Sequence, residues 1–193
     1  MREHQPVRSI VDKSRLPNGF PTHRHESVFW EQLGRVVATF AFLEETLARA
    51  IFAFTATRPY DDSEIQQAFA EWLPKLEHAL TDPLGNLIGT YDKAVRAHPG
   101  ATIMNLDDLL GDLRNAAELR NVLCHGSWPP PDANGKSVPF FVDRKKRVFD
   151  TAVDSAFLTQ VQQRAAELAC EVISTVTHMG LQFPGSTGPG EAI

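Results

Sequence analysis

The sequence has only two cysteines in 193 residues, Cys124 and Cys170, and they lie far apart along the chain. It contains no Cys-x-x-Cys pair and no Cys/His quartet, so a structural zinc site is not expected. The two cysteines are predicted to be buried free thiols in a reducing compartment. His23 and His25 lie close together but have no third ligand nearby, and we therefore expect no metal and no cofactor.

Long hydrophobic runs are also missing. No apolar stretch reaches the roughly 18 residues that a membrane-spanning helix needs. The first residues, MREHQPVRSIVDKSR, lack the apolar run of a signal peptide. The sequence has no Gly-rich phosphate-binding loop and supports no Ser/His/Asp arrangement. These absences predict a cytoplasmic protein that does not contact membranes.

The chain has no excess of positive charge. It carries 19 Lys and Arg against 24 Asp and Glu, for a formal net charge of -5. This balance excludes proteins that coat nucleic acid by bulk charge. It is compatible with a local basic groove on an acidic body. Hydrophobic residues make up 42% of the chain, which is enough for a core at this length.

Apolar residues recur with helical spacing over most of the chain. The expected helices cover about residues 25–54, 61–80, 84–98, 105–125 and 154–181. The residues expected to face the core are Leu33, Val37, Phe40, Leu47, Ile51 and Phe54 in the first helix, and Phe157, Val161, Ala165, Leu168, Val172 and Val176 in the last. Asp154 is expected to cap the last helix.

The other segments complete a predicted domain plan. The stretches SVPFFVD and RVFD flank three cations, which predicts a β-hairpin at about residues 137–150 with a basic tip. Residues 1–24 are polar and contain three prolines, so they are expected to form a flexible arm. Residues 183–193, FPGSTGPGEAI, are expected to be a disordered tail. The predicted fold is therefore an all-α, up-and-down bundle of four to five helices over residues 25–182, with a short β-hairpin before the last helix.

Residues 118–128, ELRNVLCHGSW, place polar side chains in an otherwise apolar helix. Asn121 and His125 are four residues apart and share one helical face. The long stem of Arg120 can bring its guanidinium toward that face. Gly126 is expected to end the helix as a left-handed terminator. Three polar side chains are thus predicted to form one small site at the end of the helix.

A second polar residue stands out in the first helix. Glu44 occupies a position of the expected apolar stripe where a leucine would be typical. A carboxylate on a core face needs a partner, because burying it alone is costly. Arg120 is the predicted partner, whereas Glu45 shares a face with Arg49 and is expected to be exposed. A purely structural reading is also open, in which Arg120 and Glu44 join two helices and His125 caps the last carbonyls.

The pattern Arg120-Asn121-x3-His125 resembles the Arg-x4-6-His motif of the HEPN superfamily. This superfamily comprises small helical bundles, many of them metal-independent endoribonucleases of toxin–antitoxin, abortive-infection and CRISPR systems. The resemblance covers roughly residues 25–180. The HGSW continuation, the hairpin and the N-terminal arm depart from the simplest members.

The resemblance implies a mechanism in which the 2′-hydroxyl of RNA attacks the adjacent phosphate and leaves a 2′,3′-cyclic phosphate and a 5′-hydroxyl. His125 would act as general acid or base, and Arg120 would stabilise charge on the phosphate. Asn121 would orient His125 or a phosphate oxygen, and Glu44 would position Arg120. The resemblance also implies a homodimer whose two motifs face one cleft, RNA as the substrate, and an antitoxin or inhibitor protein as a partner.

Four residues beyond the motif are candidates for substrate binding. Trp128 is expected either to stack on a base or to cover the end of the bundle. Arg144, Lys145 and Lys146 are expected either to contact an RNA backbone or to form a solvated hairpin tip. The alternative interpretation of the whole chain is a non-catalytic binding or dimerisation module with the same fold.

Overall fold

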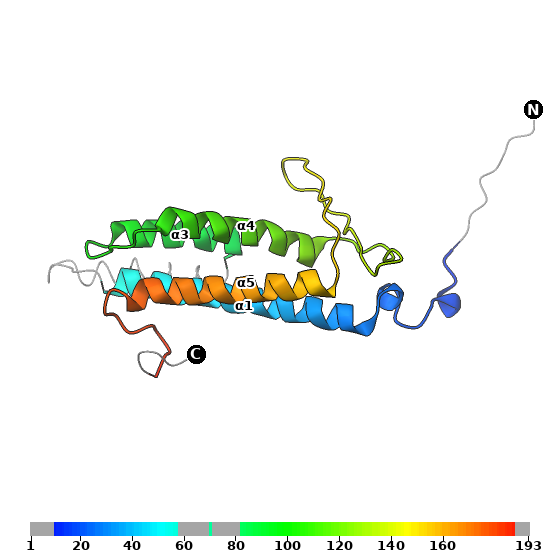
Figure 1. Ribbon diagram of the computed structural model, residues 1–193, viewed down its shortest axis with the longest axis horizontal. Helices are drawn as coiled ribbons and strands as arrows, with labels where there is room; N and C mark the ends of the chain where they lie inside the picture. The colour runs from blue at the N-terminus through cyan, green and yellow to red at the C-terminus, as the bar shows by residue number, and fades with distance from the viewer. Residues whose placement is uncertain (1–9, 58–69, 71–81, 188–193) are drawn as a thin grey trace, which may run out of the picture.

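Helices dominate the structure. The computed structural model describes residues 10–57, residue 70 and residues 82–187. Its α-helices are α1 (Ser27–Ala56), α3 (Leu84–Ala97), α4 (Leu106–His125) and α5 (Ser155–Thr177). They pack together as a bundle in which α4 runs antiparallel to α5 (Figure 1). The all-α class is confirmed for this part of the chain, and the helix expected at residues 61–80 lies outside it.

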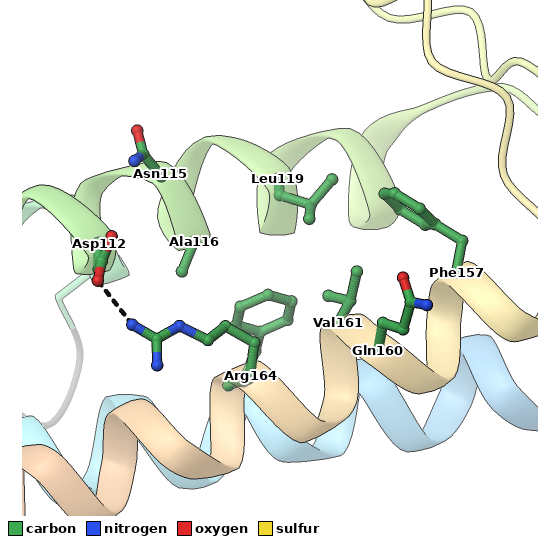
Figure 2. A pocket seen from close by; sticks show the side chains of 10 residues that line it. Asp112, Asn115, Ala116, Leu119, Phe157, Gln160, Val161 and Arg164 are labelled. Atoms are coloured by element: carbon green, nitrogen blue, oxygen red, sulfur yellow. Dashed lines mark hydrogen bonds and ion pairs between the residues drawn. The ribbon is translucent and has the colours of Figure 1, made fainter.

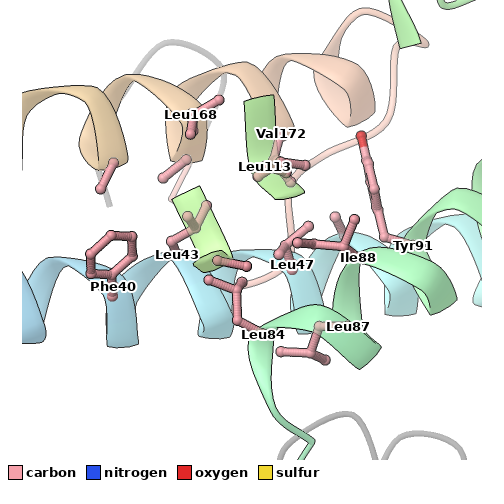
Figure 3. Close-up of a cluster of buried hydrophobic side chains, with 14 of the residues drawn as sticks. Phe40, Leu43, Leu47, Leu84, Leu87, Ile88, Tyr91, Leu113, Leu168 and Val172 are labelled. Carbon is pink, nitrogen blue, oxygen red and sulfur yellow. The ribbon is translucent and has the colours of Figure 1, made fainter. Parts of the chain in front are cut away.

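The core draws on all four helices. The most extensive interface joins α1 and α5, and α3 and α4 cover them (Figure 1). Buried side chains from each helix meet in one cluster, shown in Figure 3. Asp154 caps α5 as expected, because its Oδ1 accepts a hydrogen bond of 2.8 Å from the Phe157 backbone N–H. None of the described helices combines the length and hydropathy of a membrane span.

The buried stripe of α1 differs from the predicted one at alternate positions. Val37, expected to face the core, is 40% exposed, whereas Val36 is fully buried. Seven residues further along α1, Leu43 is buried in the core and Glu44 lies beside it at the edge of the core. The prediction that Glu44 replaces a core leucine is therefore wrong, because Leu43 fills that position and Glu44 flanks it.

Two further expectations are wrong. Phe183 is only 1% exposed and packs in the core, so the predicted disordered tail cannot begin at this residue. The Arg49 guanidinium also donates a hydrogen bond to the Pro184 carbonyl at 3.3 Å. Cys124 and Cys170 are free as predicted, but both are exposed rather than buried. They lie on the solvent-facing sides of α4 and α5.

Residues 126–154, the α4–α5 connection, contain no β-strand, and neither does any other described part of the chain. Three isolated antiparallel bridges form instead, Ser127–Phe140, Ser137–Val153 and Val142–Val148. The predicted hairpin is therefore unconfirmed as a pair of strands. The next hydrogen-bonded pair after the first bridge would be Pro129 with Val138, and Pro129 has no backbone N–H, so the ladder stops there. The chain nonetheless reverses at residues 143–147, where the Asp143 N–H donates to the Arg147 carbonyl at 3.0 Å.

Gly126 ends α4 for a different reason from the predicted one. Its φ of -68° and ψ of 142° are ordinary extended values, so it is not a left-handed terminator. A Cβ at this position would lie 2.6 Å from the Val122 carbonyl oxygen and 2.9 Å from the Pro139 Cβ. Glycine is needed here because the α4–α5 connection passes close to the end of the helix.

Replacing Gly126 with alanine is expected to lower the free energy of unfolding by about 1–3 kcal/mol, because the added methyl group overlaps the helix end and Pro139. Urea unfolding followed by circular dichroism measures this change. The matched control is Gly111→Ala in the interior of α4, where no atom lies within 4 Å of the added Cβ. That change is expected to stabilise by about 0.5–1 kcal/mol. Two variants of equal stability would contradict the close approach at Gly126.

Candidate functional site

An ion pair joins α4 to α1 at the predicted site. The Arg120 Nη2 lies 3.4 Å from the Glu44 Oε1, and the two side chains are 26% and 24% exposed. The expected contact between these residues is therefore present. The Glu44 Oε1 is itself buried and has no hydrogen bond, so the contact has the distance of an ion pair without hydrogen-bond alignment. The carboxylate depends on the Arg120 guanidinium for charge compensation.

Arg120 also contacts the next residue of the motif. Its Nη1 donates a hydrogen bond to the Asn121 Oδ1 at 3.4 Å. The guanidinium thus lies between a carboxylate on α1 and an amide on α4. Arg120 is half-buried and Asn121 is exposed, so this Glu44–Arg120–Asn121 chain runs from the edge of the core to the surface. Such an arrangement fixes the position of the guanidinium while leaving the amide accessible.

His125 is the last residue of α4 and is exposed. Within the described part of the chain its ring forms no hydrogen bond or ion pair. The Val122 carbonyl near the end of the helix accepts a hydrogen bond of 2.8 Å from the Gly126 N–H instead. The expectation that His125 caps the last carbonyls is therefore not met. Its ring is open to solvent one helical turn beyond Asn121.

Trp128 lies in an aromatic cluster at this end of the bundle. Its ring centroid is 5.0 Å from that of Phe29 and 6.3 Å from that of His25. His25 also stacks on Phe29 at 4.3 Å. The partly buried position of Trp128 supports the expectation that it covers the bundle end.

The Pro129 carbonyl holds the start of the α4–α5 connection in place. It accepts hydrogen bonds from the His25 Nε2 at 2.8 Å and from the Ser137 hydroxyl at 2.9 Å. The segment that precedes α1 and two parts of the α4–α5 connection therefore meet just beyond the motif. This contact was not predicted, because a backbone carbonyl leaves no signal in a sequence.

Arg144, Lys145 and Lys146 are exposed at the turn of the connection and form no ion pairs with other described residues. Arg147 differs, because its guanidinium pairs with Asp143 at 2.6 Å and with Glu118 of α4 at 3.0 Å. Hydrogen bonds from the Arg147 backbone and side chain hold the pKa of Asp143 below its usual value. The turn is thus fixed by Asp143 and presents three uncompensated cations to solvent. The connection carrying them projects from the bundle (Figure 1).

A groove between α4 and α5 was not predicted. It has a volume of about 290 Å³, and Figure 2 shows it closed at one side by the ion pair of Arg164 and Asp112, 2.6 Å apart. Its lining residues are Phe40, Asp112, Asn115, Ala116, Leu119, Phe157, Gln160, Val161, Arg164 and Ala165. None of the predicted site residues lines it. Its two charged residues are already paired with each other, so it offers no free charged group.

In residues 10–57, 70 and 82–187, no three His, Cys, Asp or Glu side chains lie close enough together to hold a metal ion. A comparison of the chain with protein-family models, with curated proteins and with solved structures found no match.

Proposed function

We propose that this protein is a HEPN-like, metal-independent endoribonuclease. The observation that carries the proposal is the chain from Glu44 through Arg120 to Asn121, which ends one helical turn from the open ring of His125. A guanidinium held by a carboxylate suits the binding of a phosphate group, because its planar fork is already oriented. An unpaired, exposed imidazole is accessible to a substrate for proton transfer.

In the proposed reaction the 2′-oxygen of RNA forms a bond to the adjacent phosphorus and the bond to the 5′-oxygen breaks. A general base takes the proton of the 2′-hydroxyl, and a general acid gives a proton to the departing 5′-oxygen. His125 serves in one of these roles. Arg120 stabilises the charge on the non-bridging phosphate oxygens, and Asn121 orients His125 or one of those oxygens. The products are a 2′,3′-cyclic phosphate and a 5′-hydroxyl.

The proposal includes a homodimer in which the motifs of two chains face one cleft, so that a second His125 supplies the other proton transfer. The open position of His125 at the end of α4 is compatible with such a composite site. A toxin or defence effector controlled by an antitoxin or inhibitor protein is the setting that the motif suggests.

The second candidate function is a non-catalytic binding or dimerisation module. It is favoured by the same contact between Arg120 and Glu44, because an ion pair at the edge of a core also serves to join two helices. In this interpretation the exposed His125 and Asn121 have no role in chemistry.

Incubation with total RNA and with a labelled RNA oligonucleotide in EDTA tests the proposal. We expect cleavage that persists in EDTA and gives 2′,3′-cyclic phosphate ends, and no cleavage of the matching DNA, which lacks the 2′-hydroxyl. Intact RNA across varied sequences, with folded protein whose oligomeric state has been measured, would favour the binding module. Cleavage that yields 5′-phosphate ends would contradict the mechanism.

A further inference from the structure

Phe140 is an aromatic side chain left in solvent. It is 70% exposed, although its neighbours in the α4–α5 connection, Pro139 and Phe141, are buried and partly buried. Its backbone is firmly placed, because Phe140 and Ser127 exchange both of their hydrogen bonds. The Phe140 N–H donates to the Ser127 carbonyl at 2.8 Å, and the Ser127 N–H donates to the Phe140 carbonyl at 3.0 Å.

This pairing decides which way the ring faces. Directly opposed residues of an antiparallel pair project their side chains to the same side, and their neighbours project to the other. Ser127 is exposed, like Phe140. Trp128 and Phe141, the next residues on each segment, are partly buried, and Trp128 packs on Phe29. The Phe140 ring and the Ser127 hydroxyl therefore share the solvent side.

The same pairing places Phe140 near the motif. Ser127 follows His125 by two residues, so their Cα atoms are at most about 7 Å apart. The Cα atoms of a hydrogen-bonded antiparallel pair are about 5.5 Å apart. Phe140 thus flanks His125 at a range that a nucleotide next to the scissile phosphate can span.

Further exposed side chains follow Phe140 along the connection, in the direction away from His125. Val142 lies two residues beyond Phe140, opposes Val148 and is exposed with it. The turn beyond them carries the uncompensated cations Arg144 and Lys145, with Lys146. An aromatic ring beside the candidate acid or base is therefore followed by apolar side chains and then by free positive charge, on a chain of net charge -5.

We propose that Phe140 is the residue on which a base flanking the scissile phosphate stacks, and that the cations of the turn contact the RNA backbone further along the strand. This inference rests on the proposed ribonuclease function. Single-stranded nucleic acid is held by exposed aromatic rings together with cations, which is the combination found here. Trp128, the aromatic residue expected from the sequence, is occupied by Phe29 and His25.

The test uses an oligonucleotide of DNA with a single ribonucleotide, so that only one phosphate is cleavable. Phe140→Ala is expected to lower kcat/KM for this substrate by about 5- to 150-fold, the range found for loss of base stacking on an aromatic ring. Phe140→Tyr is expected to stay within a few-fold of the wild type. An abasic site in place of the flanking base should slow the wild type to a similar degree and add little to Phe140→Ala. Val37→Ala, which truncates an exposed apolar residue of α1, is the matched control.

Binding of an all-DNA oligonucleotide of the same sequence, measured by fluorescence anisotropy, separates this inference from the proposed function. We expect Phe140→Ala to raise Kd several-fold, and Val37→Ala to leave it unchanged. If the wild type cleaves RNA and Phe140→Ala matches it in both kcat/KM and Kd, the stacking role is wrong and the ribonuclease function stands. If the wild type cleaves nothing, the ribonuclease function fails, and an unchanged Kd for Phe140→Ala then overturns the stacking role as well.

Discussion

Replacing His125 with alanine is expected to reduce RNA cleavage by about 10²- to 10⁴-fold, the range associated with loss of a general acid or base. The fold should be unaffected, because the ring is exposed and forms no hydrogen bond or ion pair in the described structure. The measurement is the initial rate of cleavage of a labelled RNA in EDTA, together with the thermal unfolding midpoint of each protein.

The matched control is His178→Ala. His178 is also exposed and lies directly after an α-helix, at the C-terminal end of α5. That end lies at the opposite end of the bundle from the C-terminal end of α4 (Figure 1). We expect this variant to cleave RNA at the wild-type rate. Loss of activity in both variants would point to a general effect of histidine removal, and full activity of His125→Ala would remove His125 from the mechanism.

Replacing Arg120 with alanine is expected to affect both activity and stability. Cleavage should fall by about 10²- to 10³-fold, because the charge on the phosphate oxygens loses its stabilising partner. The free energy of unfolding should fall by about 1–3 kcal/mol, because the buried Glu44 Oε1 is left without its cation. For a protein of this size, the thermal midpoint should drop by several degrees.

Two further variants separate the two effects. Arg120→Lys keeps the charge beside Glu44 but loses the planar fork, so we expect near-normal stability with strongly reduced cleavage. Adding Glu44→Gln to Arg120→Ala removes the unpaired charge, so stability should recover in part while cleavage stays low. Full activity of Arg120→Lys would contradict a bidentate phosphate contact. Full activity of Arg120→Ala with reduced stability would assign the ion pair a structural role alone.

The positions of the four described α-helices followed from the sequence, but the rotation of α1 did not. Two apolar stripes with helical spacing share Leu33, Phe40 and Leu47. The first continues through Val36 and Leu43. The second continues through Val37 and Glu44. Because residues 36 and 37 are both valine, the spacing of apolar residues alone does not distinguish the two stripes at this point. Leu43 distinguishes them, because a leucine next to a glutamate takes the core position.

The contact between Arg120 and Glu44 could be predicted because a carboxylate near the core of one helix needs a cation from another. The shape of the bundle end around Trp128 could not be predicted. The aromatic cluster around Trp128 and the shared carbonyl of Pro129 depend on how an irregular connection folds back, and such a path has no periodic signal. The exposure of Phe140 could not be predicted either, because alternation of apolar and polar residues does not reveal which face of an isolated bridge meets solvent.

The pairing of α1 with α5 has a consequence for synthesis on the ribosome. The most extensive helix interface joins the first and last helices of the described chain, with roughly a hundred residues between them. At translation rates of about 5–20 residues per second, α1 waits roughly 5–20 s for its main partner. During that interval its apolar stripe has no α5 to cover it. A nascent chain therefore completes this core only after α5 has been synthesised, about a hundred residues after α1.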